Sequence, residues 1–221
     1  MRQVTGRSSK NSTIKASIRL ASGGRFFSAS MVENVAEEGD IVVTIDTPRA
    51  TLVTAQILSE LSAETILAIN GQNLLSSEVA VVSDAIDNKL AVIALDKKAH
   101  DLLVEKFSER LHFTSPLLST THSDKNALII ETADSSTYYL RLYNNGLQLA
   151  EALDLASEDE LLYYVANILD IAATDIPIYI IDPKDVPLRD SRVRHIKDVA
   201  TSGMETLLSL LSFERRDGSK Q

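Results

Sequence analysis

Histidine and cysteine are the residues that most often bind metals or act as nucleophiles. In this chain neither residue indicates a metal site or a nucleophile. The chain has no cysteine, which excludes disulfides, thiolate metal sites and cysteine nucleophiles. The four histidines lack the i, i+4 spacing that places two metal ligands on one helical face. They are His100, His112, His122 and His195. We therefore predict no metal site, and surface or helix-end positions for these histidines.

The carboxylates are better explained by structure than by catalysis. Ser157-Glu158-Asp159-Glu160 has the spacing of a capping box, in which Ser157 and Glu160 bind each other's backbone amides at the start of a helix. Asp182 and Asp185 follow an apolar strand, where α/β proteins do place functional groups, although a loop role is favoured. No P-loop sequence and no Gly-x-Ser-x-Gly elbow occurs. We predict no catalytic residue.

Two groups of residues could contact a partner. The first is a basic cluster, Arg189, Arg192, Arg194, His195 and Lys197, which could bind an acidic partner or a phosphate group. A solvated strand or helix face explains it more simply. The second is the tyrosines, all of which lie after residue 137. Tyr138 and Tyr139 must face opposite sides of a strand. An outward tyrosine would suit a protein interface, but packing at the edge of a core is favoured.

Composition limits the class of protein. The chain has 221 residues, 44% hydrophobic and 24% charged, as in an ordinary packed globule. Its net charge of −9 disfavours nucleic-acid binding, which depends on neutralising phosphates. No run approaches the roughly 20 apolar residues of a membrane helix. Residues 1–13 are polar and basic, unlike a secretory signal. We predict a soluble, cytoplasmic protein.

Hydrophobic periodicity divides the chain into two halves. In the first, Ile14 to Leu20 alternates as a strand, Ser22-Gly23-Gly24 forms a tight turn, and Arg25 to Met31 returns as a second strand. A third strand, two helices and further strands follow. The remaining predicted elements of this half are Ile41–Ile45, Ala50–Val53, a helix over Ser62–Ile69, Asn88–Leu95, a helix capped by Asp96, and His112–Leu117.

The second half repeats the order of three strands, a helix, a strand and a helix. Asn144-Asn145-Gly146 predicts its hairpin turn. The predicted elements are strands over Ala127–Ile130, Thr137–Tyr143, Leu147–Leu155 and Pro177–Ile181, a helix after Ser157, a short strand in Val193–Ala200 and a helix over Met204–Phe213. We predict a disordered arm (1–13), two halves (14–118 and 119–213) and a polar tail (214–221).

Two stretches resemble an uncharacterised Bacteroidetes family with an actin-like ATPase fold, catalogued as a domain of unknown function. One is Leu147 to Ile171, in which Ala152-Leu153 leads into the capping box and Leu161-Leu162-Tyr163-Tyr164. The other is Lys15 to Leu20 followed by Gly24-Arg25-Phe26-Phe27-Ser28. The resemblance implies an α/β, duplicated ribonuclease H-like (actin-like ATPase) fold, with mixed sheets flanked by helices. It supports fold better than function.

The resemblance also implies candidate nucleotide-binding turns. Actin-like ATPases hold phosphates with a hairpin turn in each half, usually carrying Asp-x-Gly. The corresponding turns here contain Ser22, Gly23 and Gly24 in the first half and Asp134, Ser135 and Ser136 in the second. The first turn lacks an aspartate, and the second lacks a glycine, which makes close backbone approach harder.

Our leading hypothesis is therefore a noncatalytic binding or scaffold protein on an actin-like fold, with degenerate nucleotide loops and no cofactor. Its partner would be another protein, neither a nucleic acid nor a membrane. The alternative is a divergent nucleotide-binding ATPase of the actin-like superfamily that uses ATP and Mg²⁺. A ribonuclease H-like nuclease would need acidic residues on neighbouring strand ends around two metals, and the opening strands offer none.

Overall fold

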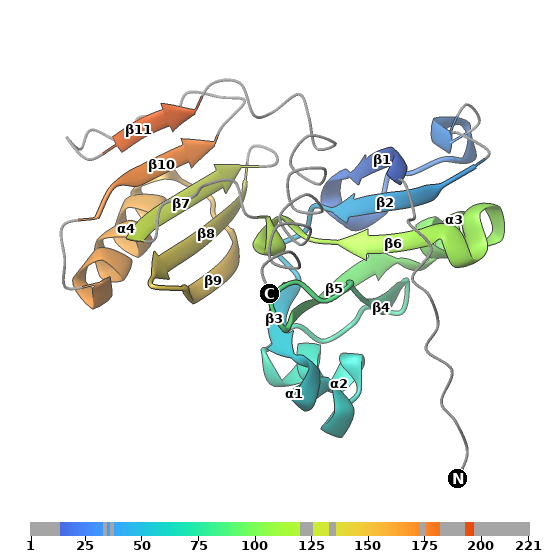
Figure 1. Cartoon of the computed structure of the whole chain (residues 1–221), viewed down its shortest axis with the longest axis horizontal. Helices are drawn as coiled ribbons and strands as arrows, with labels where there is room; N and C mark the ends of the chain where they lie inside the picture. Colours follow the sequence, from blue (N-terminus) through green and yellow to red (C-terminus); the bar gives the residue numbers. More distant parts are fainter. Residues whose placement is uncertain are drawn as a thin grey trace, which may run out of the picture.

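The computed structural model describes residues 14–32, 35, 38–119, 126–132, 136–172, 176–181 and 193–196. Figure 1 shows strands gathered into sheets, with helices packed against them. Within the described ranges there are three sheets, one of them with five strands. The chain is an α/β protein, as the sequence predicts.

The first half contains a three-stranded parallel sheet in the order β1-β2-β6. Its central strand is a run of β-branched residues, of which Ile41, Val42 and Val43 are buried. Such apolar runs are typical of strands in parallel sheets, which are covered on both faces. The strands are β1 (Ile14–Leu20), β2 (Asp40–Ile45) and β6 (Leu111–Thr114).

An antiparallel sheet, β3-β5-β4, forms the rest of the first half. Residues of helix α2 pack on one face of this sheet. Ser62 caps α2 by accepting the Thr65 amide at 3.2 Å, and Asp96 caps α3, both as predicted. The elements are β3 (Ala50–Thr54), α1 (Ala55–Glu60), α2 (Ala63–Ile69), β4 (Glu78–Val82), β5 (Lys89–Asp96) and α3 (Lys97–Phe107). Short 3-10 helices are η1 (Ala21–Gly24), η2 (Ala29–Val32), η3 (Ser108–Arg110) and η4 (Pro116–Leu118).

The segment after β1 differs from the prediction. The predicted strand Arg25–Met31 is wrong, because the chain turns at residues 25 and 26 and then forms η2. The predicted hairpin at Ser22-Gly23-Gly24 is also wrong, because β1 pairs with β2 in parallel. Parallel strands need a long crossover rather than a tight turn. Positive φ angles at Ser22 and Gly23 direct the chain out of the sheet into that crossover.

The second half forms one mixed sheet in the order β11-β10-β7-β8-β9. β7, β8 and β9 are antiparallel, and β10 and β11 add in parallel beside β7. Asn145 and Gly146 adopt positive φ in the predicted hairpin turn between β8 and β9. The elements are β7 (Asn126–Thr132), β8 (Thr137–Asn144), β9 (Leu147–Asp154), α4 (Glu158–Ala172), β10 (Ile178–Ile181) and β11 (Val193–Ile196).

The capping box at the start of α4 is confirmed, with one difference. The Glu160 amide donates to Ser157 Oγ at 3.3 Å, as predicted. The Glu160 carboxylate accepts from the Ala156 amide at 2.8 Å, one residue earlier than the usual partner. The acidic residues Glu158, Asp159 and Glu160 therefore lie in the first turn of a helix, where negative charge suits the helix dipole.

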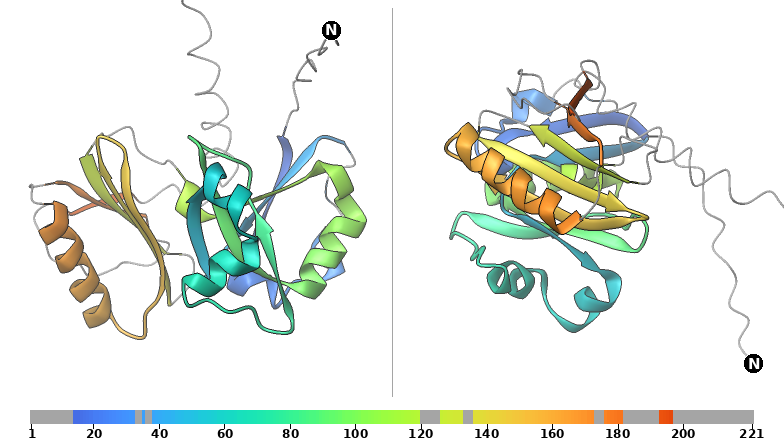
Figure 2. Two further views of the ribbon diagram at one scale, coloured as in Figure 1. Left: turned by 90° about the horizontal axis from the view of Figure 1, so that it is seen from below. Right: turned by 90° about the vertical axis from the view of Figure 1, so that its left-hand side faces the viewer.

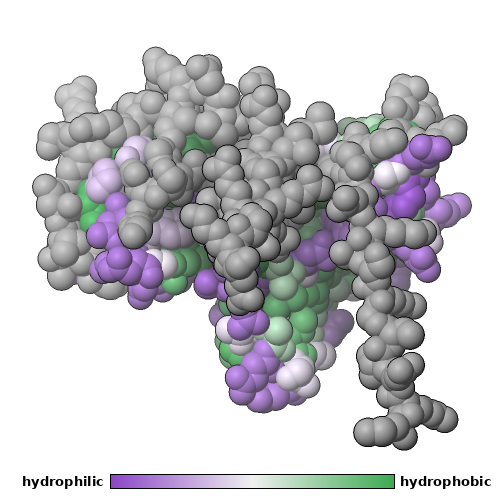
Figure 3. All heavy atoms as spheres, in the orientation of Figure 1, coloured by the Kyte–Doolittle hydropathy of each residue, from purple (hydrophilic) through white to green (hydrophobic). Residues whose placement is uncertain are grey.

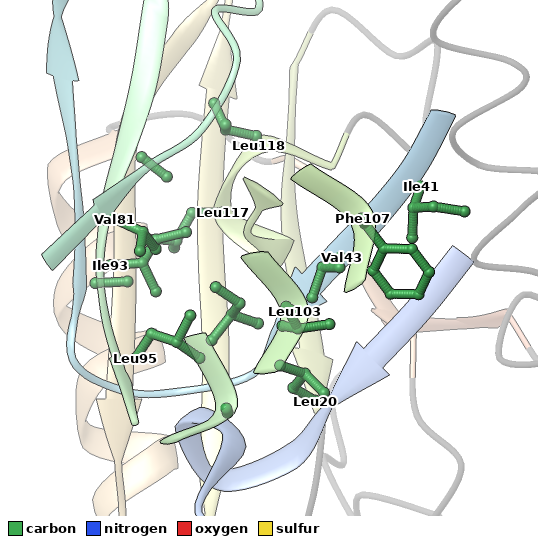
Figure 4. Close-up of a cluster of buried hydrophobic side chains, with 14 of the residues drawn as sticks. Leu20, Ile41, Val43, Val81, Ile93, Leu95, Leu103, Phe107, Leu117 and Leu118 are labelled. Atoms are coloured by element: carbon green, nitrogen blue, oxygen red, sulfur yellow. The ribbon is translucent and has the colours of Figure 1, made fainter. Parts of the chain in front are cut away.

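The five-stranded sheet lies between two apolar cores. On one face, Leu128, Ile130 and Leu140 belong to a core with buried residues of α4. On the other face, Tyr139 joins the core of the first half, with Ala152 packed beside it. Figure 2 (left) shows α4 and the first half on opposite sides of this sheet. Figure 4 shows the first-half core, where Leu20, Val43 and Leu103 converge. The two halves therefore share a core.

The longest described helix, α4, has 15 residues, and none of the described helices could span a bilayer.

Candidate functional site at the junction of the halves

The glycines of the first predicted nucleotide turn are used for packing. Gly23 and Gly24 are buried, and the Gly23 amide donates to the Asp46 carbonyl at 2.8 Å. A side chain on Gly24 would place its Cβ 2.9 Å from Ala99 Cβ. Both glycines have positive φ, which explains why glycine stands there. The Gly23 amide is thus already engaged within the protein, and Gly24 lets the chain lie close to α3.

Arg19 and Asp46 form a bidentate ion pair at the ends of β1 and β2. Arg19 Nε donates to one Asp46 oxygen at 2.5 Å, and Nη2 donates to the other at 3.0 Å. The Asp46 side chain is only 4% exposed, so this pair satisfies a nearly buried carboxylate. Burial alone would lower the pKa of Arg19, but the hydrogen bond and charge of Asp46 outweigh burial and raise it.

The network continues across the junction to the second half. Arg19 Nη2 also donates to Glu131 Oε1 at 3.5 Å, and Glu131 Oε2 accepts from Arg141 Nη2 at 2.9 Å. Arg141 is fully buried, and its Nη1 donates to the Pro116 carbonyl in η4. Glu131 and Arg141 lie on the sheet face that meets the first half. The four side chains therefore form a chain of alternating charges, Asp46, Arg19, Glu131 and Arg141.

Tyr139 joins the halves beside this charge network. Its hydroxyl accepts the Thr47 amide at 2.7 Å and lies 3.4 Å from the Thr47 carbonyl. Tyr139 is fully buried and pairs with Glu131 across β7 and β8. Burial, followed by the charge of Asp46, raises the pKa of Tyr139 well above its ordinary value. The tyrosine therefore stays neutral and holds the turn after β2.

The predicted site residues are only partly placed by the structure. Ser22, Gly23 and Gly24 lie at the junction, where a Cβ added to Gly23 would lie 3.6 Å from Thr47 Oγ1. Ser136 begins the return from β7 to β8, and its carbonyl accepts the Leu155 amide at 2.9 Å. Asp134 and Ser135 lie outside the described residues. Whether these four described residues bind nucleotide stays a prediction.

Sequence reasoning missed the acidic residues at the junction. Asp46 directly follows the apolar strand β2, and Glu131 comes near the end of the apolar strand β7. An apolar run ending in a carboxylate is the signal that could have found both. Arg141 gave no such signal, because it stands among apolar and aromatic residues of β8 and its burial depends on the other half of the chain.

The other residues considered from sequence take structural positions where they are described. His100 stacks on Phe113, and His112 lies between Asp84 and Asp40, with its ring nitrogens 2.7 and 3.7 Å from their carboxylates. Tyr138 packs with the α4 core, opposite Tyr139, which confirms that the pair faces both sides. Arg194 and His195 lie in the edge strand β11. His122, Asp182, Asp185, Arg189, Arg192 and Lys197 lie outside the described residues.

At the described part of the junction, the groups that could contact magnesium or a phosphate already have partners within the protein. Both carboxylates that could organise a metal are paired with arginine, and the Gly23 amide is bonded to Asp46. No group of three or more metal-ligating side chains occurs among the residues that the structure describes. The arrangement can hold two halves together, since it joins β1 and β2 to β7 and β8 through charge-assisted hydrogen bonds.

The comparisons with known proteins bear on the fold. No family model and no curated protein matches the chain. A crystal structure from Bacteroides thetaiotaomicron, of a protein with actin-like ATPase fold and unknown function, superposes with a TM-score of 0.61 at 14% identity, over 77% of this chain and 73% of that one. The cytoplasmic domain of EpsL, an inner membrane component of the type II secretion system of Vibrio cholerae, matches with a TM-score of 0.47 at 12% identity, over 90% and 93%.

The first of these likenesses shows that the chain has an actin-like ATPase fold. The actin-like ATPase fold implied by the resemblance in sequence is thereby confirmed, whereas the internal duplication of a ribonuclease H-like unit stays a prediction. Fold alone does not decide function, since one fold hosts many activities.

Proposed function

We propose that this chain is a noncatalytic binding or scaffold protein built on an actin-like fold. The observation that carries the proposal is the pairing of Asp46 and Glu131 with Arg19 and Arg141. Carboxylates at the meeting point of two such halves are the groups that could organise a metal and its water. Here each one accepts charge-assisted hydrogen bonds from guanidinium groups.

The energetics of burial support the same proposal. Removing one partner of a buried ion pair leaves an uncompensated charge, which is costly. A metal ion would have to displace Arg19 or Arg141 from the carboxylates, and a phosphate would have to displace a carboxylate from the arginines. Either exchange leaves one member of an ion pair without its partner. The junction is therefore better suited to fix the two halves in one arrangement than to exchange ligands.

Thermal unfolding with ATP, ADP or GTP, each with Mg²⁺, tests the proposal. A nucleotide present at about 100 times its Kd would stabilise the folded chain by about 2.7 kcal/mol. For a chain of this size, that corresponds to a rise in Tm of roughly 5–10 °C. We expect no rise with any of the three nucleotides.

The alternative function is a divergent nucleotide-binding ATPase. Two observations favour it: the Arg19 side chain is 43% exposed, and the buried Nε of Arg141 has no hydrogen-bond partner among the described residues. Both groups could donate to an anion. This alternative predicts nucleotide-induced stabilisation that is lost on Gly23→Ala or Asp134→Ala substitution. Such a result would contradict the scaffold proposal.

We further propose that the protein acts in the cytoplasm. Its lack of cysteine suits a reducing compartment, where disulfides do not form. Fractionation of cells that express the tagged chain would test this, and recovery outside the cytoplasmic fraction would contradict it.

A further inference from the structure

A small helical lobe of the first half exposes apolar side chains. We call α1, α2 and the loop to β4 (residues 55–77) the acidic lobe. Helix α1 buries none of its residues. Ile57 in α1 and Leu61, the extended residue that follows the helix, are 43% and 38% exposed. Ile69 and Leu75 in the same lobe are 69% and 48% exposed. Figure 3 shows hydrophobic residues gathered over this part of the molecule, with hydrophilic residues at its tip.

Scattered exposed apolar residues are ordinary, but helix α1 is too short to be stable without contacts to other parts of the protein. Six residues are far fewer than the roughly 12–15 that an isolated helix needs to be even marginally stable in water. Helix α2, by contrast, anchors Ile66 and Leu67 in the core against β5. Helix α1 has an N-cap, since Thr54 Oγ1 accepts the Ile57 amide, and its Leu58 packs against the same core, but no apolar residue of α1 is fully buried. A partner that covered Ile57 and Leu61 would remove apolar surface from water.

The charge of the lobe identifies the kind of partner. From Ala50 to Asn88 the chain has no lysine, arginine or histidine, but it has Glu60, Glu64, Glu78, Asp84 and Asp87. Glu78 is paired with Arg49, and Asp84 contacts His112. Glu60 and Glu64 are exposed beside the apolar residues of α1 and α2. Within the lobe itself the charged residues are Glu60 and Glu64, which lie beside its apolar side chains, and Arg49 contacts the lobe at the Asn73 carbonyl.

We propose that the acidic lobe is a docking surface for a basic amphipathic helix of a partner protein. The inference rests on the proposed binding function and names the class of partner. Apolar residues on one face of that helix would cover Ile57 and Leu61, and flanking lysine or arginine would pair with Glu60 and Glu64. Amphipathic helices commonly bind apolar surfaces in this way. Nucleic acids and anionic membranes would be repelled by the same charge.

Fluorescence anisotropy with the full chain and two labelled peptides tests this proposal. The probe is a leucine–lysine amphipathic helix of about 18 residues, five turns, and its counterpart carries glutamate in place of lysine. The lobe variants are Ile57→Ser with Leu61→Ser, and Glu60→Lys with Glu64→Lys. The matched controls change residues equally exposed elsewhere. They are Val104→Ser with Leu162→Ser, and Glu105→Lys with Glu109→Lys.

We expect the lysine peptide to bind the native chain and to bind each lobe variant at least tenfold more weakly. The two control variants should bind as the native chain does, and the glutamate peptide should not bind. If the lobe and control variants lost affinity for the lysine peptide equally, the peptide would be binding to the overall acidity of the chain, which would overturn the proposal. Absence of binding to the native chain would also overturn it. Binding that appears only after Leu207→Ser with Leu208→Ser would show that the chain's own C-terminal segment occupies the lobe, which also overturns it. None of these outcomes depends on whether nucleotide binds, so failure here is distinct from failure of the noncatalytic assignment.

Discussion

Charged side chains are paired and mostly buried at the junction, but exposed in the acidic lobe. At the junction, two carboxylates and two guanidinium groups pair in a largely buried chain that links the halves. In the lobe, Glu60 and Glu64 are exposed in a stretch of sequence without a basic residue. Charges of the first kind stabilise an arrangement, whereas charges of the second kind remain available to a partner. The comparison predicts that junction substitutions change stability, and lobe substitutions change binding.

The largest expected effect is at Arg141. Substitution Arg141→Met keeps much of the side-chain volume but leaves Glu131 with only the longer contact to Arg19. We expect the free energy of unfolding to fall by about 3–5 kcal/mol, the usual cost of breaking a buried ion pair. Urea denaturation measures it. The control is Arg25→Met, whose side chain is 56% exposed and 3.8 Å from Glu78, and which should change stability by less than about 0.5 kcal/mol. A loss below about 1 kcal/mol at Arg141 would remove the contrast between the two regions.

Two glycines give a matched pair for the same comparison. Gly24 at the junction and Gly71 in the lobe both have positive φ, but only Gly24 has neighbours within 4 Å of an added Cβ. Gly71→Ala should cost about 1 kcal/mol of backbone strain. Gly24→Ala should cost about 1–3 kcal/mol more, because Ala99 and Leu95 must move. Equal losses in thermal unfolding would show that the turn is not tightly packed.

The pH dependence of stability tests the role of Tyr139 at the junction. Because its pKa is raised on folding, the neutral phenol stabilises the folded chain below about pH 10, and this stability is lost as pH rises further. Tyr139→Phe should cost about 1 kcal/mol at pH 7, since the Thr47 amide loses its acceptor. Above pH 10, the variant should lose stability less steeply than the native chain. Tyr163→Phe, at a 67% exposed position, should leave both the stability at pH 7 and its slope above pH 10 unchanged. An unchanged alkaline slope in Tyr139→Phe would contradict this account.

The smallest expected effect on stability is in the lobe. Ile57→Ser with Leu61→Ser should change the free energy of unfolding by only about 0.5 kcal/mol, because neither side chain is buried. Chemical denaturation would check it. A loss above about 2 kcal/mol would show that Ile57 and Leu61 contribute to the core and are structural.

Local signals in the sequence predicted much of the fold. Caps such as Ser62, Asp96 and Ser157 depend on residues within one helical turn, and all three form. The Asn145-Gly146 turn is equally local. The prediction of a strand over Arg25–Met31 was wrong. Apolar residues in a crossover resemble those of a strand, and the sequence does not show whether the segment has a pairing partner. Strand β4 was not predicted, although Val79-Ala80-Val81-Val82 is an apolar run, because it lacks clear alternation.

The candidate site was harder to predict, because it exists only where distant segments meet. Arg19 and Glu131 are 112 residues apart in sequence, and no spacing rule connects them. The sequence predicted a turn at Ser22-Gly23-Gly24 but took it for a hairpin, and the packing role of its glycines depends on α3, which is distant in sequence. Asp46 and Glu131 carried a usable signal, an apolar strand ending in a carboxylate. Their pairing with arginine could not be inferred from it.

Isothermal titration calorimetry of the full chain with Mg²⁺-ATP tests the central claim most directly. If the junction carboxylates and the Gly23 amide are committed to contacts within the protein, titration should give only heat of dilution. Saturable heat at one equivalent, lost in the Gly23→Ala variant, would show that the junction releases these groups to a nucleotide and would contradict the account.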